Sequence, residues 1–196
     1  MRVTLAVTDP MPTLSAIDGT AALQAASGLP QAARLHHLGL TASRVEWGSE
    51  IDTRWRETPG GTCARPARID LRLAQTEHGI RIAREVPRGG CLWRAVEAHE
   101  RRHTALNQAT LRRAATAMRR AAEAWAPRAE GHGPDAAAAV AQLQAGLRQA
   151  IEPALAAMRA ARDAGHAAID SPEEYARLSR LCPADQAVLR RALGLD

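Results

Sequence analysis

Residues 92–126 read LWRAVEAHERRHTALNQATLRRAATAMRRAAEAWA, with no Gly or Pro and with Ala, Leu, Arg and Glu as the main residue types. These residue types favour an α-helix. Within this stretch, mostly apolar residues recur at steps of three and four, and such a stripe is typical of a helix with one buried face. The stripe consists of Leu92, Val96, His99, His103, Leu106, Thr110, Ala114, Ala117 and Ala121. We therefore predict one long helix that Pro127 ends.

Further helices are expected after this one. Glu130 to Pro134 is a loop, and Asp135 can cap a second long helix that runs to about Ala168, with a kink at Pro153. The order Ser171-Pro172-Glu173-Glu174 is typical of a helix start, and that helix should reach about Leu181. A last helix should begin at Pro183 and end before Gly194.

The first 90 residues indicate strands and irregular structure, with a short helix near 20–26. The segment around Val45 and Trp47 suits a strand, and residues 58–61 suit a turn. Alternation in 69–73 predicts a half-buried strand, which would turn at 75–79 and return to Val86. The expected fold is α+β: a small antiparallel sheet, then a long helical hairpin and a short helical tail. We expect a single domain over 1–196, mainly β or irregular over 1–90 and helical over 91–196.

His99-Glu100-Arg101-Arg102-His103 has the pattern H-E-x-x-H within the first predicted helix. Side chains four residues apart share one helix face, with Cβ atoms about 5–6 Å apart, so both imidazoles can reach one ion. Zinc accepts such ligands. Glu100 would lie beside a zinc-bound water and could take its proton. The alternative is a pair of hydrogen-bonded core histidines with a solvated glutamate.

A catalytic zinc needs a third protein ligand and an open position. Folding the helical hairpin about residue 131 brings 159–163 opposite the motif, so the far end of the second helix should lie beside it. The polar residues in that region are Asp163, His166, Asp170, Glu173 and Glu174. We predict His166 as the third ligand and Glu174 as the alternative. Both residues also have ordinary interpretations, His166 as a solvated or orienting histidine and Glu174 as a helix-capping group.

Other polar residues carry weaker expectations. His36 and His37 precede the sheet and are further candidate ligands, whereas His78 and His132 fall in predicted turns and should be solvated. Asn107, one turn after the motif, could orient a ligand, and an ordinary polar position is the alternative.

Three cysteines are present. Folding the predicted hairpin about residue 77 brings Cys63 opposite residue 91, so a Cys63–Cys91 disulfide is favoured, which would imply an oxidising compartment. Two reduced buried thiols are the alternative, and Cys182 is either unpaired or the true partner of one of the others. Because no C-x-x-C spacing occurs, we do not predict the cysteines to be metal ligands.

Composition limits the remaining possibilities. The net charge is +5 and every one of the 26 basic residues is Arg, interspersed with Asp and Glu. No nucleic-acid motif accompanies these charges, so we expect solvated helix faces and no nucleic-acid partner. No apolar run suits a membrane span. The first residues lack the pattern of a signal peptide, so we expect either an intracellular protein or a mature exported form.

The segment from Gly90 to His103, GCLWRAVEAHERRH, resembles the motif region of uncharacterised secreted bacterial proteins that are predicted zinc-dependent proteases. The resemblance covers roughly residues 62–107, and a weaker resemblance to the same proteins occurs at residues 169–175. It implies zinc at His99 and His103, a base at Glu100 and a periplasmic or secreted location. The extended pattern H-E-x-x-H-x-x-G-x-x-H is absent, which leaves the third ligand open.

The sequence therefore predicts a zinc-dependent hydrolase, with a peptide or protein substrate and a cell-wall peptide amide as the rival substrate class. The alternative is a non-catalytic helical interaction protein with a structural or relic metal site. The oligomeric state is not predicted.

Overall fold

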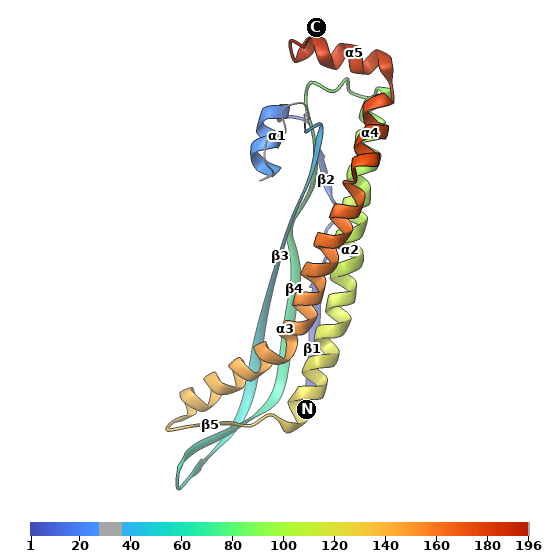
Figure 1. The fold of residues 1–196 in the computed structure, drawn as a ribbon. Helices are drawn as coiled ribbons and strands as arrows, with labels where there is room; N and C mark the ends of the chain where they lie inside the picture. Colours follow the sequence, from blue (N-terminus) through green and yellow to red (C-terminus); the bar gives the residue numbers. More distant parts are fainter. Residues whose placement is uncertain (28–36, 196) are drawn as a thin grey trace. The chain divides into compact units, whose positions relative to one another are not determined.

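The computed structural model describes residues 1–27 and 37–195, so the predicted candidate ligand His36 lies outside the described residues. The elements are, in chain order, β1 (Arg2–Thr8), β2 (Thr13–Ser15), α1 (Thr20–Ser27), β3 (Gly39–Thr58), β4 (Gly61–Ile82), α2 (Cys91–Trp125), the short 3₁₀ helix η1 (Ala126–Arg128), β5 (Gly131–Gly133), α3 (Ala136–Ile169), α4 (Pro172–Arg180) and α5 (Pro183–Ala192). Strands precede long helices (Figure 1), which confirms the α+β class.

The helix predictions are confirmed closely. α2 begins one residue before the predicted start and ends at Trp125. Asp135 Oδ1 accepts a hydrogen bond of 2.8 Å from the N–H of Ala138 and so caps α3. Ser171 caps α4 by accepting from the N–H of Glu174 at 3.2 Å. Caps of this kind satisfy N–H groups that the helix itself leaves unpaired, which is why they can be predicted from sequence.

The predicted turn at 75–79 is wrong, because β4 continues through it. Buried side chains fall on odd-numbered residues from Ile69 to Gln75 and on even-numbered residues from His78 to Ile82. The buried positions thus switch from odd to even residue numbers just before Gly79, and in the sequence such a switch has the same pattern as a turn between two strands. The hairpin turn lies instead at Pro59–Gly60, between β3 and β4, where residues 58–61 predicted one. His78 is consequently buried in β4 rather than solvated, with its ring nitrogen 3.1 Å from the carbonyl oxygen of Pro10.

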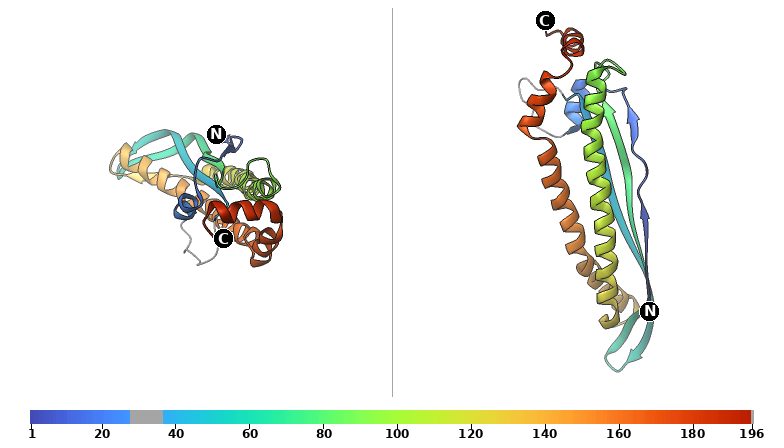
Figure 2. Two further views of the ribbon diagram at one scale, coloured as in Figure 1. Left: turned by 90° about the horizontal axis from the view of Figure 1, so that it is seen from above. Right: turned by 90° about the vertical axis from the view of Figure 1, so that its right-hand side faces the viewer.

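The sheet is mixed rather than wholly antiparallel. Among the described residues, β4 pairs with each of the other four strands. β1 and β2 run parallel to β4, with Leu5 opposite Leu71, while β5 is antiparallel to it. Figure 2 shows β1 following β4.

The chain forms two compact units. Unit 1 consists of 1–9, 45–75 and 109–161, and unit 2 of 10–44, 76–108 and 162–196. In unit 1, Leu71 of β4, Met118 of α2 and Ile151 of α3 belong to one buried apolar cluster. In unit 2, Ile82 of β4 and Leu92 of α2 belong to another. The prediction of a single domain over 1–196 stays a prediction.

The disulfide joins Cys91 to Cys182, with their Cα atoms 5.6 Å apart, and Cys63 is a buried free thiol. The favoured Cys63–Cys91 pairing is therefore wrong. It depended on a turn at 75–79, and without that turn Cys63 is not folded back opposite residue 91. Within unit 2 the disulfide and a hydrogen bond of 2.8 Å from the N–H of Leu92 to Asp185 Oδ2 attach α5 to the start of α2.

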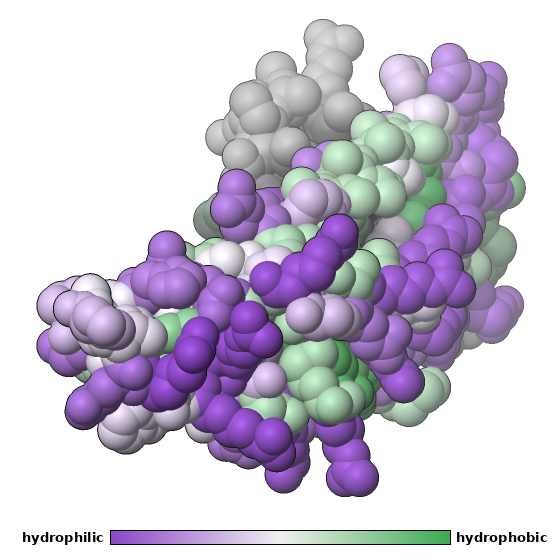
Figure 3. All heavy atoms as spheres, turned by 90° about the horizontal axis from the view of Figure 1, so that it is seen from below, coloured by the Kyte–Doolittle hydropathy of each residue, from purple (hydrophilic) through white to green (hydrophobic). Residues whose placement is uncertain are grey.

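The surface drawn in Figure 3 carries hydrophilic side chains around several smaller apolar areas. Among the residues that the structure describes, no helix combines the length and the apolar character that a membrane crossing requires.

Candidate metal centre

The two motif histidines lie one turn apart on α2 in unit 2, as the H-E-x-x-H spacing predicts. Their Nε2 atoms are 3.2 Å apart, and both side chains are buried. Two ring nitrogens at this distance can bind one ion. Burial of both rings excludes most solvent from that position.

Asp170 supplies a third atom. It lies between the end of α3 and the start of α4, and its Oδ1 is 3.0 Å from His99 Nε2 and 3.1 Å from His103 Nε2. Ligands at zinc distances of about 2.0–2.1 Å span tetrahedral edges of about 3.3–3.4 Å. The three edges of this triangle, 3.0, 3.1 and 3.2 Å, are close to that value. His99, His103 and Asp170 therefore form a group that could hold a metal ion.

The predicted third ligands occupy other positions. His166 Nδ1 is 2.7 Å from Nδ1 of His103, and Glu174 Oε1 is 3.3 Å from Nδ1 of His99. Each therefore contacts the ring nitrogen that does not belong to the triangle. Asp170 takes the place in the triangle because it lies one helical turn beyond His166, at the point where α3 ends.

Glu174 is held in place by arginines. Arg177 donates two hydrogen bonds of 2.8 Å to its two carboxylate oxygens, and Arg102 pairs with Oε1. The hydrogen bond from Arg177 and the charge of Arg102 lower the pKa of Glu174 to about 2. The ionised carboxylate can accept a hydrogen bond from His99 Nδ1–H, although Arg102 Nη2 also lies 2.8 Å from that nitrogen and can only donate to it.

The second motif histidine has a different outer partner. If His103 Nδ1 donates to His166 Nδ1, the other nitrogen of His166 carries a proton and donates to Asn107 Oδ1, at 3.1 Å. This order of protons leaves His103 Nε2 unprotonated, as a metal ligand must be. Asn107 thus contacts His166, which in turn contacts His103, and its orienting role stays a prediction.

Glu100 is buried against β3, with 5 % of its surface exposed. Thr41 Oγ1 lies 2.7 Å from Glu100 Oε2 and can donate to it. A Cβ at Gly39 would lie 2.5 Å from Glu100 Oε1, so glycine there provides the space that the carboxylate occupies. Burial raises the pKa of Glu100, although the Thr41 hydrogen bond and the charges of both motif histidines oppose the shift.

The low pKa of Asp170 depends on protons at Nε2 of both motif histidines, which a metal ion bound in the triangle would replace. Burial alone would raise the pKa of Asp170, but hydrogen bonds from His103 and His99 outweigh it and hold that pKa well below its usual range. Tyr175, whose ring centroid is 6.2 Å from that of His99, has its pKa raised by burial and by the charge of Asp170. The carboxylate is thus ionised and the phenol protonated near neutral pH.

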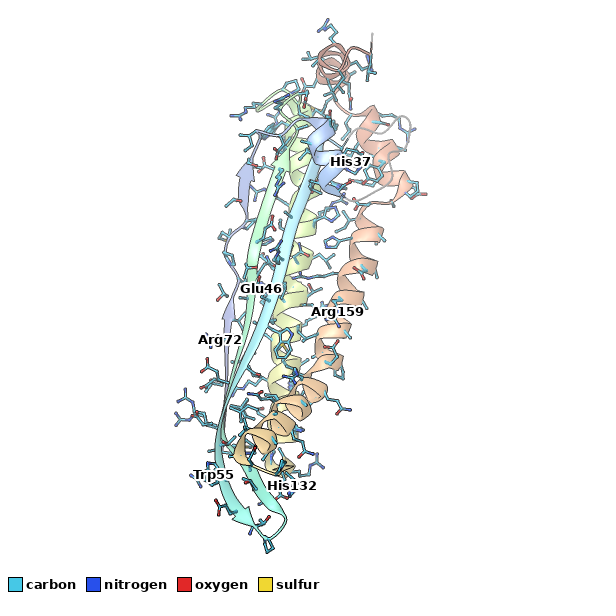
Figure 4. All side chains as sticks on the ribbon, turned by 90° about the vertical axis from the view of Figure 1, so that its left-hand side faces the viewer. His37, Glu46, Trp55, Arg72, His132 and Arg159 are labelled. Atoms are coloured by element: carbon cyan, nitrogen blue, oxygen red, sulfur yellow. A yellow bond between two sulfur atoms is a disulfide. The ribbon has the colours of Figure 1, made fainter. Side chains whose placement is uncertain are left out.

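Sequence reasoning missed three contributors to this site: Gly39, Thr41 and the role of Asp170. Asp170 was among the polar residues expected nearby, but no local pattern distinguishes it from His166. Gly39 and Thr41 carry no signal, since their importance comes from the packing of β3 against α2. His37, which Figure 4 labels, is outside the group of converging ligand atoms.

Two surface hollows of about 460 and 380 Å³ occur in unit 1, and neither is lined by a residue of this site.

Comparison of the chain with protein-family models, with curated proteins and with solved structures gave no match, so its function has to be inferred from the site itself.

Proposed function

We propose that this protein is a zinc-dependent hydrolase that cleaves peptide bonds. The observation that carries the proposal is the triangle of His99 Nε2, His103 Nε2 and Asp170 Oδ1, with edges of 3.0–3.2 Å, next to the buried Glu100. The resemblance of the motif segment to secreted bacterial proteins that are predicted zinc-dependent proteases also supports a zinc-dependent hydrolase.

The ligand set favours zinc in a catalytic role. Two imidazoles and one carboxylate are donors that zinc accepts, and catalytic zinc sites use three protein ligands and keep a fourth position open. Structural zinc sites are closed by four protein ligands, usually with cysteine. Here the cysteines Cys91 and Cys182 are joined to one another, so neither supplies a thiolate.

The surrounding residues have distinct roles in this proposal. A zinc ion would polarise the substrate carbonyl and lower the pKa of a bound water. Glu100 would act as the base for the attacking water and would return that proton to the leaving amine. Thr41 orients the carboxylate through its 2.7 Å contact, and Gly39 leaves room for it. Tyr175 keeps its proton and can donate a hydrogen bond beside the ligands.

The disulfide between Cys91 and Cys182 supports an exported, periplasmic or secreted location, since disulfides persist in oxidising compartments. A peptide or protein is the proposed substrate, and an amide of a cell-wall peptide is the rival within the same chemistry. The non-catalytic alternative, a helical interaction protein with a relic metal site, predicts metal binding without turnover.

Metal analysis and a peptidase assay test the proposal together. Protein purified without an affinity tag or added metal should contain about one zinc per chain at this site, and His99→Ala/His103→Ala should lose it. Glu100→Gln should keep the zinc and lose hydrolysis of an unfolded protein substrate. Zinc binding with no turnover of proteins or cell-wall peptides would favour the interaction protein, and iron in place of zinc would refute the proposed chemistry.

A further inference from the structure

A second cluster of potential ligands lies in unit 1, where β5 pairs with the start of β4. Cys63 on β4 is directly opposite His132 on β5, and Glu130 immediately precedes β5. Cys63 Sγ is 2.7 Å from Glu130 Oε1, and His132 Nε2 is 3.7 Å from Glu130 Oε2. One ligand atom from each of the three residues lies within 4.8 Å of the other two.

The backbone around His132 is fixed by its neighbours. A Cβ at Gly131 would lie 2.1 Å from the carbonyl oxygen of Ala139, and one at Gly133 would lie 2.6 Å from the nitrogen of the same residue. Only glycine therefore fits on either side of His132. The N–H of His132 also donates to the side chain of Gln142. The β5 strand thus presents a single side chain, the imidazole, from a closely packed backbone.

We propose that Cys63, Glu130 and His132 form a second metal site, which takes a thiophilic divalent cation of the zinc class. Thiolate, imidazole and carboxylate are all zinc donors, and a thiolate selects for such metals over magnesium or calcium. His132, which was expected to be solvated, is indeed exposed (Figure 4), so an ion can reach the cluster from solvent. The fourth position would be taken by water.

Nearby arginines are compatible with this site. Arg65 contacts Glu130 Oε1 at 3.2 Å and leaves Oε2 directed to His132. Arg65 is largely exposed, so its side chain can move away when a cation binds. The thiolate and the carboxylate together bring two negative charges, which balance Arg65 and Arg56, the latter an exposed side chain that also contacts Cys63.

A nucleophilic role for Cys63 fits the surroundings less well. Reactive cysteines have a lowered pKa. The hydrogen bond to Glu130 and burial instead raise the pKa of the Cys63 thiol, so the thiol keeps its proton and donates a hydrogen bond to the carboxylate. A bound metal would release that proton and take its place between the same two atoms.

Cobalt titration tests the site independently of the proposed hydrolase centre. A Co²⁺ ion bound by a thiolate gives a sulfur-to-cobalt charge-transfer band in the near ultraviolet. The His99, His103 and Asp170 group holds no sulfur, and Cys91 and Cys182 are joined in the disulfide. The band therefore reports on Cys63 in the full wild-type chain, whatever the first site does.

The expected result is a band that saturates at one sulfur-bound Co²⁺ per chain and is absent in Cys63→Ser. His132→Ala and Glu130→Gln should each weaken the titration by about tenfold or more, because losing a ligand costs at least as much as losing an outer partner. His37→Ala, a histidine outside both groups, should leave it unchanged. Absence of the band at millimolar Co²⁺, or a band indifferent to His132→Ala and Glu130→Gln, would overturn the proposal.

Discussion

If the protein is the zinc-dependent hydrolase proposed above, replacing Gly39 by alanine should impair catalysis while leaving the metal in place. The new Cβ would lie 2.5 Å from Glu100 Oε1 and 2.8 Å from Cγ1 of Val96, whereas ordinary contacts begin at 3.4 Å. The carboxylate must therefore move by about 0.9 Å, the difference between 3.4 and 2.5 Å, or the strand must shift by as much. Either movement disturbs the hydrogen bond from Thr41 that orients Glu100.

A displacement of about 1 Å of a catalytic group can lower the rate by about 100-fold. We therefore expect kcat/KM of Gly39→Ala to fall by about two orders of magnitude, with zinc content unchanged because the new methyl group meets the base rather than the ligands. Overpacking of this kind costs about 1–3 kcal/mol, so the melting temperature should fall but the protein should fold.

The matched control is Gly48→Ala, in the same strand, where an added Cβ has nothing within 4 Å. The assay compares both variants for hydrolysis of an unfolded protein substrate, for zinc by mass spectrometry and for thermal unfolding. If the two variants have equal activity, Gly39 does not make room for a catalytic carboxylate. If Gly39→Ala loses its zinc, the assignment of Glu100 to the base rather than to metal binding is wrong.

Three further predictions concern the ligands and the disulfide. Asp170→Asn should weaken zinc binding by at least about 100-fold in a chelator competition, because the ligand loses its charge; an unchanged affinity would remove Asp170 from the site. Glu174→Gln should weaken it by about 10–100-fold through the outer nitrogen of the first motif histidine, whereas its exposed neighbour, changed in Glu173→Gln, should have no effect. Cys182→Ser should lower the free energy of unfolding by about 4–5 kcal/mol in denaturant, since the disulfide spans 91 residues, and Cys63→Ser serves as the comparison without a lost crosslink.

The parts of the fold that were predicted correctly depend on local physics. α2 could be predicted because neither Gly nor Pro interrupts 92–126 and the apolar stripe keeps one period. α4 could be predicted because Ser171 and Pro172 satisfy or remove N–H groups that any helix start leaves unpaired. The motif spacing on α2 placed His99 and His103 on one face for the same reason.

Errors arose where a local pattern had two physical meanings. Along β4 the buried side chains switch from odd-numbered to even-numbered residues between Gln75 and His78. A single strand with this switch has the same sequence pattern as two strands joined by a turn. The wrong turn then produced the wrong disulfide, because Cys63 was folded toward residue 91 by the same assumption. The choice between the two depends on β1 and β2, which pair with β4 on either side of the change and are remote in sequence.

The position of Asp170 beside the motif histidines depends on the register between two helices. Reflection of the helical hairpin correctly indicated that the end of α3 lies beside the motif, but one helical turn separates His166 from Asp170, and only contacts between helices can select between them. Gly165 contributes to this selection, because a Cβ there would lie 2.6 Å from a methyl group of Leu106 on α2. Its small size lets α3 approach α2 closely, so that His166 contacts the outer nitrogen of His103 and Asp170 contacts the inner one. The motif therefore places two candidate ligands through local geometry, while the position of the third candidate is set by how closely two helix backbones can pack.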